Sequence, residues 1–285
     1  MADPFLFRNS NDTWYLFTEV INNDCQKGEI AISVSHDGLK SFKYLQVVLK
    51  ESWHLSWPFV FSHDGGHYMI TCATAGSPTK PVLWLYESDA GDWPFRWERK
   101  SRILFEGPLV GYALDPVIFF HEPDSTWYLM IQDSETGQER LFFSDRFDAG
   151  FMEHPDSGRH SQRHAGRVAV ETAGPHAGIW AFFQVGGDMP GTLMVVARKI
   201  ERLSRWEFQY SEEAVKVAGP LHDTAFAEQG MHTFGAHRLD NGTWVCVVDG
   251  WFNDHGHAMW SCLRSGVGNR ECWAQLTEGM VSEGG

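Results

Sequence analysis

The chain has 285 residues, of which 43% are hydrophobic and 14% are aromatic, and its formal net charge at pH 7 is −14. This acidic balance argues against nucleic acid as a partner, because phosphate binding needs clustered lysine and arginine. No run of 18 apolar residues occurs, and the N-terminus MADPFLF has neither a basic region nor a long apolar stretch. We therefore expect no membrane insertion and no signal peptide. The five cysteines form no CxxC pair, so we expect neither a disulfide framework nor a zinc site. We also expect no required cofactor.

One pattern occurs five times along the chain: an apolar strand, a polar turn rich in Asp, Asn or Gly, and a second strand led by an aromatic residue. The copies begin at Asp3, Trp57, Asp115, Ala165 and Met231. Such a pattern is typical of a β-hairpin. The aromatic residues that follow the turns are spaced by 53, 60, 52 and 64 positions, and they are Tyr15, Tyr68, Tyr128, Trp180 and Trp244.

A second strand pair lies between successive copies, so each repeat predicts a sheet of four antiparallel strands. Five such sheets with short connections predict an all-β five-bladed β-propeller, because radial repetition leaves few open sheet edges. We expect residues 1–285 to form this single domain, with blades starting near residues 2, 55, 113, 164 and 230. A β-sandwich or two stacked β domains are the alternatives that strand content alone leaves open.

In a propeller the first strand of each blade lines the axial channel, so residues at the five strand starts converge. These are Asp3, the segment from His54 to Trp57, Asp115, the segment from Ala165 to Arg167, and His232. The crowded Trp53, His54, Ser56 and Trp57 would then belong to the wall of a shared pocket.

Two aspartates, Asp3 and Asp115, occupy equivalent positions, and each precedes a proline. Proline restricts the preceding residue to extended conformations, so we expect each carboxylate to be fixed at a strand entry. The structural alternative is an Asp that caps a turn. Paired carboxylates across a pocket are what glycoside hydrolysis requires. Trp53, Trp57 and Trp251 suit stacking on sugar faces, although core packing is the alternative for any one of them.

Several motifs in this order resemble a known family: ADPFLF with WYLF, WHLSWPFVF with YMI, DP with WYLM, AGR, Q–GGD–PG and VVDG. They resemble the N-terminal propeller of plant glucosamine inositolphosphorylceramide transferases and related bacterial proteins. That domain is in turn similar to the five-bladed propellers of family 43 and family 32 glycoside hydrolases. The likeness extends from Ala2 to about Phe252.

The family 43 pattern implies an inverting hydrolase in which Asp3 is the general base and Asp115 tunes the acid. The acid itself would be a Glu at the start of blade four, where this chain reads RHAGRV from Arg163 to Val168. The resemblance thus leaves the acid unassigned. Asp249 is the substitute that we group with the catalytic residues, and Glu51 and Asp188 are further carboxylates.

The remaining expectations concern binding. His232 matches a histidine that faces an axial cation, often Ca²⁺, in family 43 propellers, although a lone histidine is more often a core residue. Arg167 suits an anionic group on the glycan, or an ion pair with a pocket aspartate. The full set of expected substrate-binding residues is Trp53, His54, Ser56, Trp57, Arg167, Gln184, Asp188 and Trp251.

Two functions follow, and the sequence slightly favours the first. The chain is either a glycoside hydrolase that acts with inversion on an oligosaccharide or polysaccharide, or a glycan-binding accessory domain of a glycosyltransferase with a degenerate catalytic centre. A protein-binding propeller is a weaker third reading. We expect a monomer, and the sequence leaves the cellular compartment open.

Overall fold

The computed structural model describes residues 1–9, 13–73, 83–107, 109, 111–172, 174, 176–186, 193–218, 231–239, 244–250 and 260–264. Over these residues the protein is all-β, and the only helix is a 3₁₀ turn, η1 (Glu122–Asp124). No helix in this part of the chain is long and apolar enough to cross a membrane. The chain divides into two compact units, one formed by Met1–His164 with Ser204–Glu207 and the other by Ala165–Leu203 with Phe208–Gly285.

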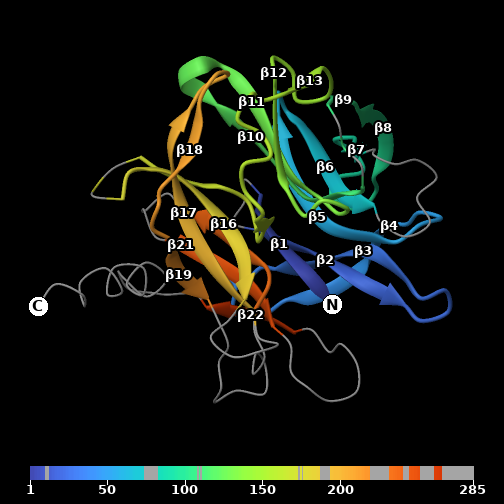
Figure 1. Cartoon of the computed structure of the whole chain (residues 1–285). Helices are drawn as coiled ribbons and strands as arrows, with labels where there is room; N and C mark the ends of the chain where they lie inside the picture. The colour runs from blue at the N-terminus through green and yellow to red at the C-terminus, as the bar shows by residue number, and fades with distance from the viewer. Residues whose placement is uncertain are drawn as a thin grey trace, which may run out of the picture. The chain divides into compact units, whose positions relative to one another are not determined.

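The first unit contains three antiparallel sheets in which strands that follow one another in the chain also pair (Figure 1). The first sheet consists of β1 (Ala2–Arg8), β2 (Trp14–Asn22), β3 (Lys27–Ser35) and β4 (Lys43–Leu49). The second consists of β5 (Leu55–His63), β6 (Gly66–Ala73), β7 (Leu83–Ser88) and β8 (Glu98–Ile103). The third consists of β10 (Ala113–His121), β11 (Thr126–Asp133), β12 (Glu139–Ser144) and β13 (Phe151–Glu153), and the short β9 (Phe105–Glu106) pairs with β13 in parallel. The unit also includes β14 (Arg163–His164).

The first strands of these sheets lie together inside the unit. Strand β1 contacts β5, and β10 contacts both β5 and β6. The rings of Phe5 on β1 and Phe59 on β5 are 4.9 Å apart. Residues at the starts of β1, β5 and β10, far apart in the sequence, are therefore neighbours in space.

Aromatic packing between the sheets repeats in the same phase as the sequence pattern. Trp93, in the connection between β7 and β8, packs on Phe7 and Tyr15 of the first sheet and stacks on His67 at 3.7 Å. Phe147, in the connection between β12 and β13, occupies the corresponding place in the next sheet. Its partners are Phe61, Tyr68 and Trp127. Tyr15 and Tyr68, two of the aromatic residues that mark the repeat, thus each contact an aromatic residue of the following sheet.

The hairpin turn of the second sheet follows the expectation from sequence. Asp64 and Gly65 have φ values of 48° and 77°, and His63 pairs with Gly66. Two consecutive positive φ values in a two-residue loop define a type I′ turn, whose twist matches that of the flanking strands.

The second unit is built on the long hairpin of β16 (Gly178–Gly186) and β17 (Leu193–Leu203). Strand β15 (Ala169–Glu171) pairs with β16, while β18 (Phe208–Tyr210) and β19 (Val215–Ala218) pair with opposite ends of β17. A further sheet contains β20 (Phe234–Arg238), β21 (Trp244–Gly250) and β22 (Trp260–Arg264).

The AGR motif joins these two sheets. The amide of Ala165 donates to the carbonyl oxygen of Phe182 at 2.8 Å, and the amide of Phe234 donates to the carbonyl oxygen of Ala165 at 2.5 Å. A Cβ on Gly166 would lie 1.9 Å from the carbonyl oxygen of Phe234. Glycine at this position is therefore required by the close approach of the two chain segments.

The expected count of five four-stranded blades needs correction. Among the described residues, four sheets have at least four strands, and the sheet of β20 to β22 has three. The described residues therefore show four full blades and three strands of a fifth sheet. Hairpin patterns report only local strand pairs, and residues 265–285, which follow β22, lie outside the described residues.

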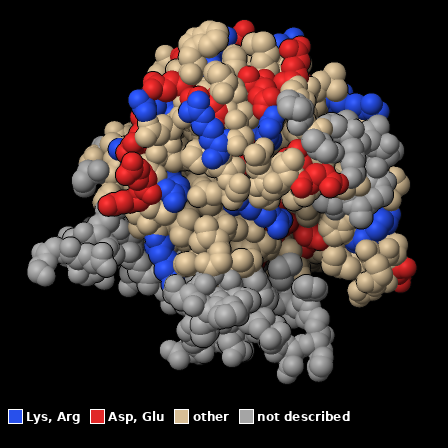
Figure 2. Space-filling model, in the orientation of Figure 1, with Lys and Arg blue, Asp and Glu red and all other residues tan. Residues whose placement is uncertain are grey.

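Charged side chains of both signs are interspersed on the face shown in Figure 2, and no continuous basic surface is visible among the residues drawn in colour.

Candidate functional site

Three residues at equivalent strand positions have the same unusual backbone. Asp3, Trp57 and Asp115 each precede a proline and have φ values of 48°, 55° and 47°. The pairing of each strand with its neighbour shifts register at this point. A left-handed backbone disfavours an ordinary L-residue by roughly 1–2 kcal/mol. Because such strain tends to gather at functional positions, its repetition in three sheets identifies a candidate site.

The expectation that each aspartate before proline is extended was therefore wrong. Proline has no N–H to give to the strand ladder, so the ladder is interrupted and each strand forms a bulge. The bulge turns the residue before proline inward. Asp3 is 7% exposed and Asp115 is 1% exposed, in contrast to a turn-capping Asp at the surface.

Trp57 connects the first strands of all three sheets. Its backbone amide donates to Oδ2 of Asp3 at 3.0 Å, and its indole Nε1 donates to the carbonyl oxygen of Pro116 at 2.8 Å. Its side chain is buried, with 3% of the residue exposed. These contacts position Asp3 beside the strand that carries Asp115, and they do not favour the expected role as a sugar platform.

Asp115 forms a two-point ion pair with Arg163. Arg163 Nε donates to Oδ2 at 2.5 Å, and Nη2 donates to Oδ1 at 3.3 Å. The Arg163 side chain is 43% exposed, whereas that of Asp115 is 2% exposed. Burial opposes the charge on Arg163, but the carboxylates of Asp115 and, more weakly, Asp3 raise its pKa.

Cys72 and Ser56 lie near this pair. The Cys72 thiol donates to the carbonyl oxygen of Ala113 at 3.5 Å. Burial, together with the negative charge of Asp115, raises the pKa of Cys72 to about 12, against a smaller opposing effect of a hydrogen bond with Ser56. Because only a thiolate is an effective nucleophile, Cys72 is inert at neutral pH. The expected pocket residue Ser56 thus lies near Asp115, bonded to this thiol.

His54 and Trp53, also expected in the pocket wall, make other contacts. His54 Nδ1 accepts from the amide of Gly28 at 3.0 Å, and Nε2 lies 3.1 Å from Oε1 of Glu19. The hydrogen bond with Glu19 raises the pKa of His54 and burial opposes it, while the Gly28 contact requires a lone pair on Nδ1 and so favours the neutral ring. His54 therefore fastens the start of β5 to the first sheet.

Trp53 is 2% exposed and packs face to face with Trp84, with ring centroids 6.4 Å apart. The Arg99 guanidinium lies over both rings and pairs with Glu51, and the Tyr86 hydroxyl also donates to Glu51. These contacts are those of core packing and do not favour sugar stacking by Trp53. Glu51, one of the candidates for the missing acid, is thus held by Arg99 and Tyr86 within this packing.

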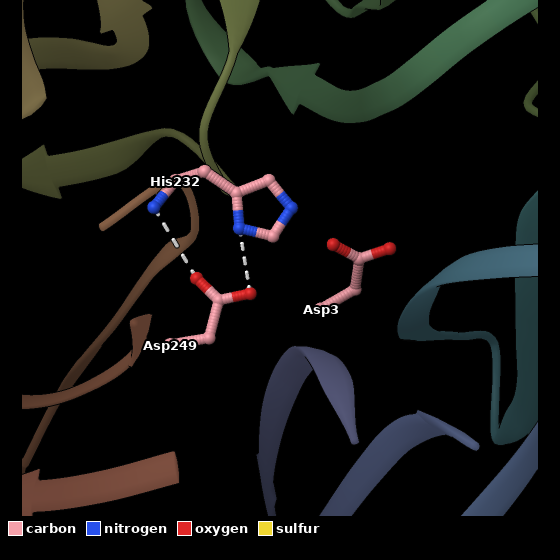
Figure 3. Close-up of side chains that lie close together, drawn as sticks. All are labelled: Asp3, His232 and Asp249. Atoms are coloured by element: carbon pink, nitrogen blue, oxygen red, sulfur yellow. Dashed lines mark hydrogen bonds and ion pairs between the residues drawn. The ribbon is translucent and has the colours of Figure 1, made fainter. Parts of the chain in front are cut away.

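In the second unit, His232 and Asp249 contact each other (Figure 3). His232 Nδ1 lies 2.7 Å from Oδ2 of Asp249, and the amides of His232 and Thr233 donate to Oδ1 at 3.3 and 2.7 Å. The Thr233 hydroxyl donates to Oδ2 at 3.1 Å. Asp249 is 1% exposed, and these contacts hold its carboxyl group against His232 and Thr233. Asp3, also drawn in Figure 3, belongs to the first unit.

The other expected site residues are less informative. Gln184 is 9% exposed on β16. Arg167 is partly buried, and burial lowers its pKa to about 10, so its guanidinium stays charged at neutral pH. Asp188 and Trp251 lie outside the described residues.

The structure thus brings together Asp3, Trp57 and Asp115, and adds Arg163, which the sequence reasoning did not select. The signal for Arg163 was present, because RHAGRV stands where the resemblance requires an acidic residue. Sequence alone did not reveal that the replacement forms an ion pair with Asp115.

Solved structures with a similar fold include several carbohydrate-active enzymes. An exo-1,5-α-L-arabinanase from a bovine ruminal metagenomic library is similar with a TM-score of 0.62 and 14% identity, over 93% of this chain and 96% of that one. An α-L-arabinanase from Cellvibrio cellulosa has a TM-score of 0.62 with 16% identity, over 87% of this chain and 86% of that one. The family 32 β-fructofuranosidase BmSUC1 from Bombyx mori has a TM-score of 0.64 with 14% identity, over 90% of this chain and 56% of that one. The fold is therefore the propeller-like arrangement of small antiparallel sheets found in glycoside hydrolases of this type.

The sequence comparison defines the family more closely. The family described as glucosamine inositolphosphorylceramide transferase 1, N-terminal, matches residues 1–251, and the chain belongs to this family. Glucosamine inositolphosphorylceramide transferase 1 of Oryza sativa subsp. japonica is 27% identical over 88% of this chain and 33% of its own length. The Arabidopsis thaliana protein of the same name is 28% identical over 88% of this chain and 32% of its own length. The chain thus spans about a third of these relatives.

Proposed function

We propose that this chain is a glycan-binding domain whose centre recognises a sugar without cleaving it. The observation that carries the proposal is the ion pair between Asp115 and Arg163. Inverting glycoside hydrolysis needs a proton donor opposite the base, and the resemblance assigns that donor to the position where this chain has Arg163 and its neighbours. An arginine is always protonated near neutral pH and cannot act as a general acid.

The state of Asp115 supports the same proposal. A carboxylate that tunes a general acid acts on the proton of that acid, whereas Asp115 here bonds to a guanidinium through both oxygens. Membership in a transferase N-terminal family also agrees with a binding role. In such a protein the propeller would hold a glycan or glycolipid head group while another domain performs the transfer.

The proposal predicts saturable binding without turnover. Isothermal titration with arabinohexaose, β-1,3-galactotriose and xylo-oligosaccharides should give a binding isotherm for at least one glycan, while reducing-end assays on the same mixtures should show no release of sugar. A panel with no binding would refute the proposal, as would turnover that Asp3→Asn abolishes.

Hydrolysis remains the second candidate, because Asp3 is a buried carboxylate at the position that the resemblance assigns to the general base. It predicts release of reducing sugar with inversion, and the Asp3→Asn variant should then lose activity by a large factor. Retention of the full rate in that variant would exclude Asp3 as the base.

Two finer features are part of the proposal. We propose that β20 to β22 belong to a fifth blade, which a crystal structure would test by a direct count of sheets. We also propose that His232 faces a cation such as Ca²⁺ partly through water, because calcium takes oxygen ligands and Asp249 binds Nδ1 and so fixes the orientation of the ring. Calcium titration followed by thermal melting should show stabilisation that His232→Ala removes.

A further inference from the structure

Arg163 has two hydrogen-bonding edges, and Asp115 uses one of them. A guanidinium carries five N–H donors in a plane. Asp115 accepts from Nε and from one hydrogen of Nη2. Nη1 and the second hydrogen of Nη2 form the other edge, and Arg163 makes no further hydrogen bond to the residues that the structure describes. This edge belongs to a side chain that is 43% exposed, whereas its anchor, Asp115, is 2% exposed.

The anchor holds the guanidinium in a defined place. Asp115 sits in a bulge of β10, and the indole of Trp57 donates to the carbonyl oxygen of the next residue, Pro116. A planar donor group fixed from behind by a buried carboxylate loses little conformational freedom when it binds a ligand. A ligand that approaches this centre would therefore meet Arg163 before Asp115.

The charges around Arg163 select the kind of ligand. An arginine only donates hydrogen bonds, so the ligand must present acceptor oxygens. The negative charge of Asp115 balances the positive charge of Arg163, and Asp3 adds a further negative charge that acts on the same guanidinium. A carboxylate or phosphate would add another negative charge to a centre that is already acidic, whereas neutral hydroxyl groups would not.

We propose that Arg163 is the ligand-contacting residue of the glycan site, that Asp115 positions it, and that its outer edge binds two neighbouring hydroxyl groups of a neutral sugar. This inference rests on the proposed glycan-binding function. It replaces the expectation of an anionic glycan with a neutral one, and it assigns the recognition to Arg163 in the first unit.

The first experiment distinguishes the ligand class. Isothermal titration compares the neutral oligosaccharides arabinohexaose and β-1,3-galactotriose with a matched pair, methyl β-D-glucoside and methyl β-D-glucuronide, which differ only at C6. We expect binding of neutral sugars and no gain in affinity for the glucuronide. Tighter binding of the glucuronide would overturn the inference and leave glycan binding intact, whereas no binding by any glycan would refute both.

The second experiment tests the residues with whichever neutral glycan binds. Arg163→Lys retains a positive charge but loses the planar fork, and we expect affinity to fall about tenfold or more, as for loss of hydrogen bonds to a charged group. Unchanged affinity in this variant would refute contact by Arg163.

A separate comparison of variants tests whether Asp115 positions Arg163. Asp115→Asn should weaken binding in the wild-type background but have no further effect in the Arg163→Gln background, because Asp115 acts through Arg163. The double variant Asp115→Asn/Arg163→Gln also avoids a buried unpaired carboxylate, so thermal melting should show that it folds. Equal losses in both backgrounds would exclude the positioning role.

Arg99→Gln is the matched control. Arg99 is also 43% exposed and also pairs with a buried carboxylate, Glu51, but it lies on the outer strand β8. Its loss should leave glycan affinity unchanged, and an equal loss of affinity in this variant would mean that the effect of Arg163 is only structural.

Discussion

Trp57 illustrates how single residues assemble the centre of the first unit. It stands before Pro58 with a left-handed backbone, φ of 55°, and its two N–H groups bond to Asp3 and to the carbonyl oxygen of Pro116. One residue thus joins three strands that are distant in the sequence. The residue contributes to the site by holding other groups in place.

Trp57→Phe should destabilise the protein by about 1–3 kcal/mol, because it leaves the buried carbonyl oxygen of Pro116 without its donor. Thermal or denaturant unfolding measures the change. Trp206→Phe is the control, since Trp206 is 78% exposed and surface substitutions of this kind change stability by about 0.5 kcal/mol or less. Equal effects of the two substitutions would contradict the role given to the indole N–H.

The carboxylate of Asp37 should make the stability of the protein depend on pH. Hydrogen bonds from Ser41, through its hydroxyl and its amide, together with bonds from Ser35 and Lys40, hold the pKa of Asp37 well below its usual range. A carboxylate with a depressed folded pKa contributes stability above its unfolded pKa of about 3.9 and loses it as pH falls.

The stability difference between wild type and Asp37→Asn should therefore be constant from neutral pH to about pH 4 and shrink below that value. Melting temperatures across this range measure it. Asp24→Asn serves as control, because the exposed carboxylate of Asp24 accepts no hydrogen bond among the described residues and the difference should be small throughout. A difference for Asp37→Asn that grows on acidification would contradict the assignment.

At the residue scale, the sequence predicted where residues lie on the strands better than it predicted which groups they contact. The repeat selected Asp3, Trp57 and Asp115 as strand-start residues, and these three do meet. It did not predict their left-handed backbone, because the bulge arises from strand pairing, which overrides the local preference of a residue before proline. Nor did it separate Trp57 from Trp53, which stand four positions apart and pack in different surroundings.

At the scale of elements, the hairpins were the most predictable feature. The segment His63 to Gly66 contains the Asp-Gly pair that a type I′ turn requires, and the turn forms with φ values of 48° and 77° at its two central residues. The aromatic residues after each turn lie on second strands, as their spacing indicated. Local chemistry was sufficient here because a two-residue loop fixes its own register.

Gly65→Ala tests the turn. A Cβ at this position would meet no atom within 4 Å, so the expected loss of roughly 1–2 kcal/mol comes from the positive φ alone. Denaturant unfolding measures it, and Gly91→Ala is the matched control, because Gly91 also has open space around it and has no positive φ. A loss as large at Gly91 as at Gly65 would contradict a conformational origin.

The inter-sheet aromatic contacts were not predictable in the same way. Trp93 and Phe147 are 54 positions apart and occupy corresponding places, each on the first two strands of the preceding sheet. The sequence shows the aromatic residues but not their partners, because those lie in the preceding sheet and are brought close only by the packing of sheets.

At the scale of the whole molecule, the net charge leads to a simple prediction. With a net charge of −14, the protein should give no mobility shift with duplex DNA even at low salt, where phosphate binding is strongest. A saturable shift would contradict the exclusion of nucleic acid.

The sequence by itself determined the all-β class, the hairpin repeat, the net negative charge and the family resemblance, because each depends on residues that are close in the chain or on composition. Only the tertiary structure decided the number of full blades, the inward bulges before proline and the pairing of Arg163 with Asp115, 48 positions away. These features depend on which distant strands become neighbours, and that is decided when the sheets pack against one another.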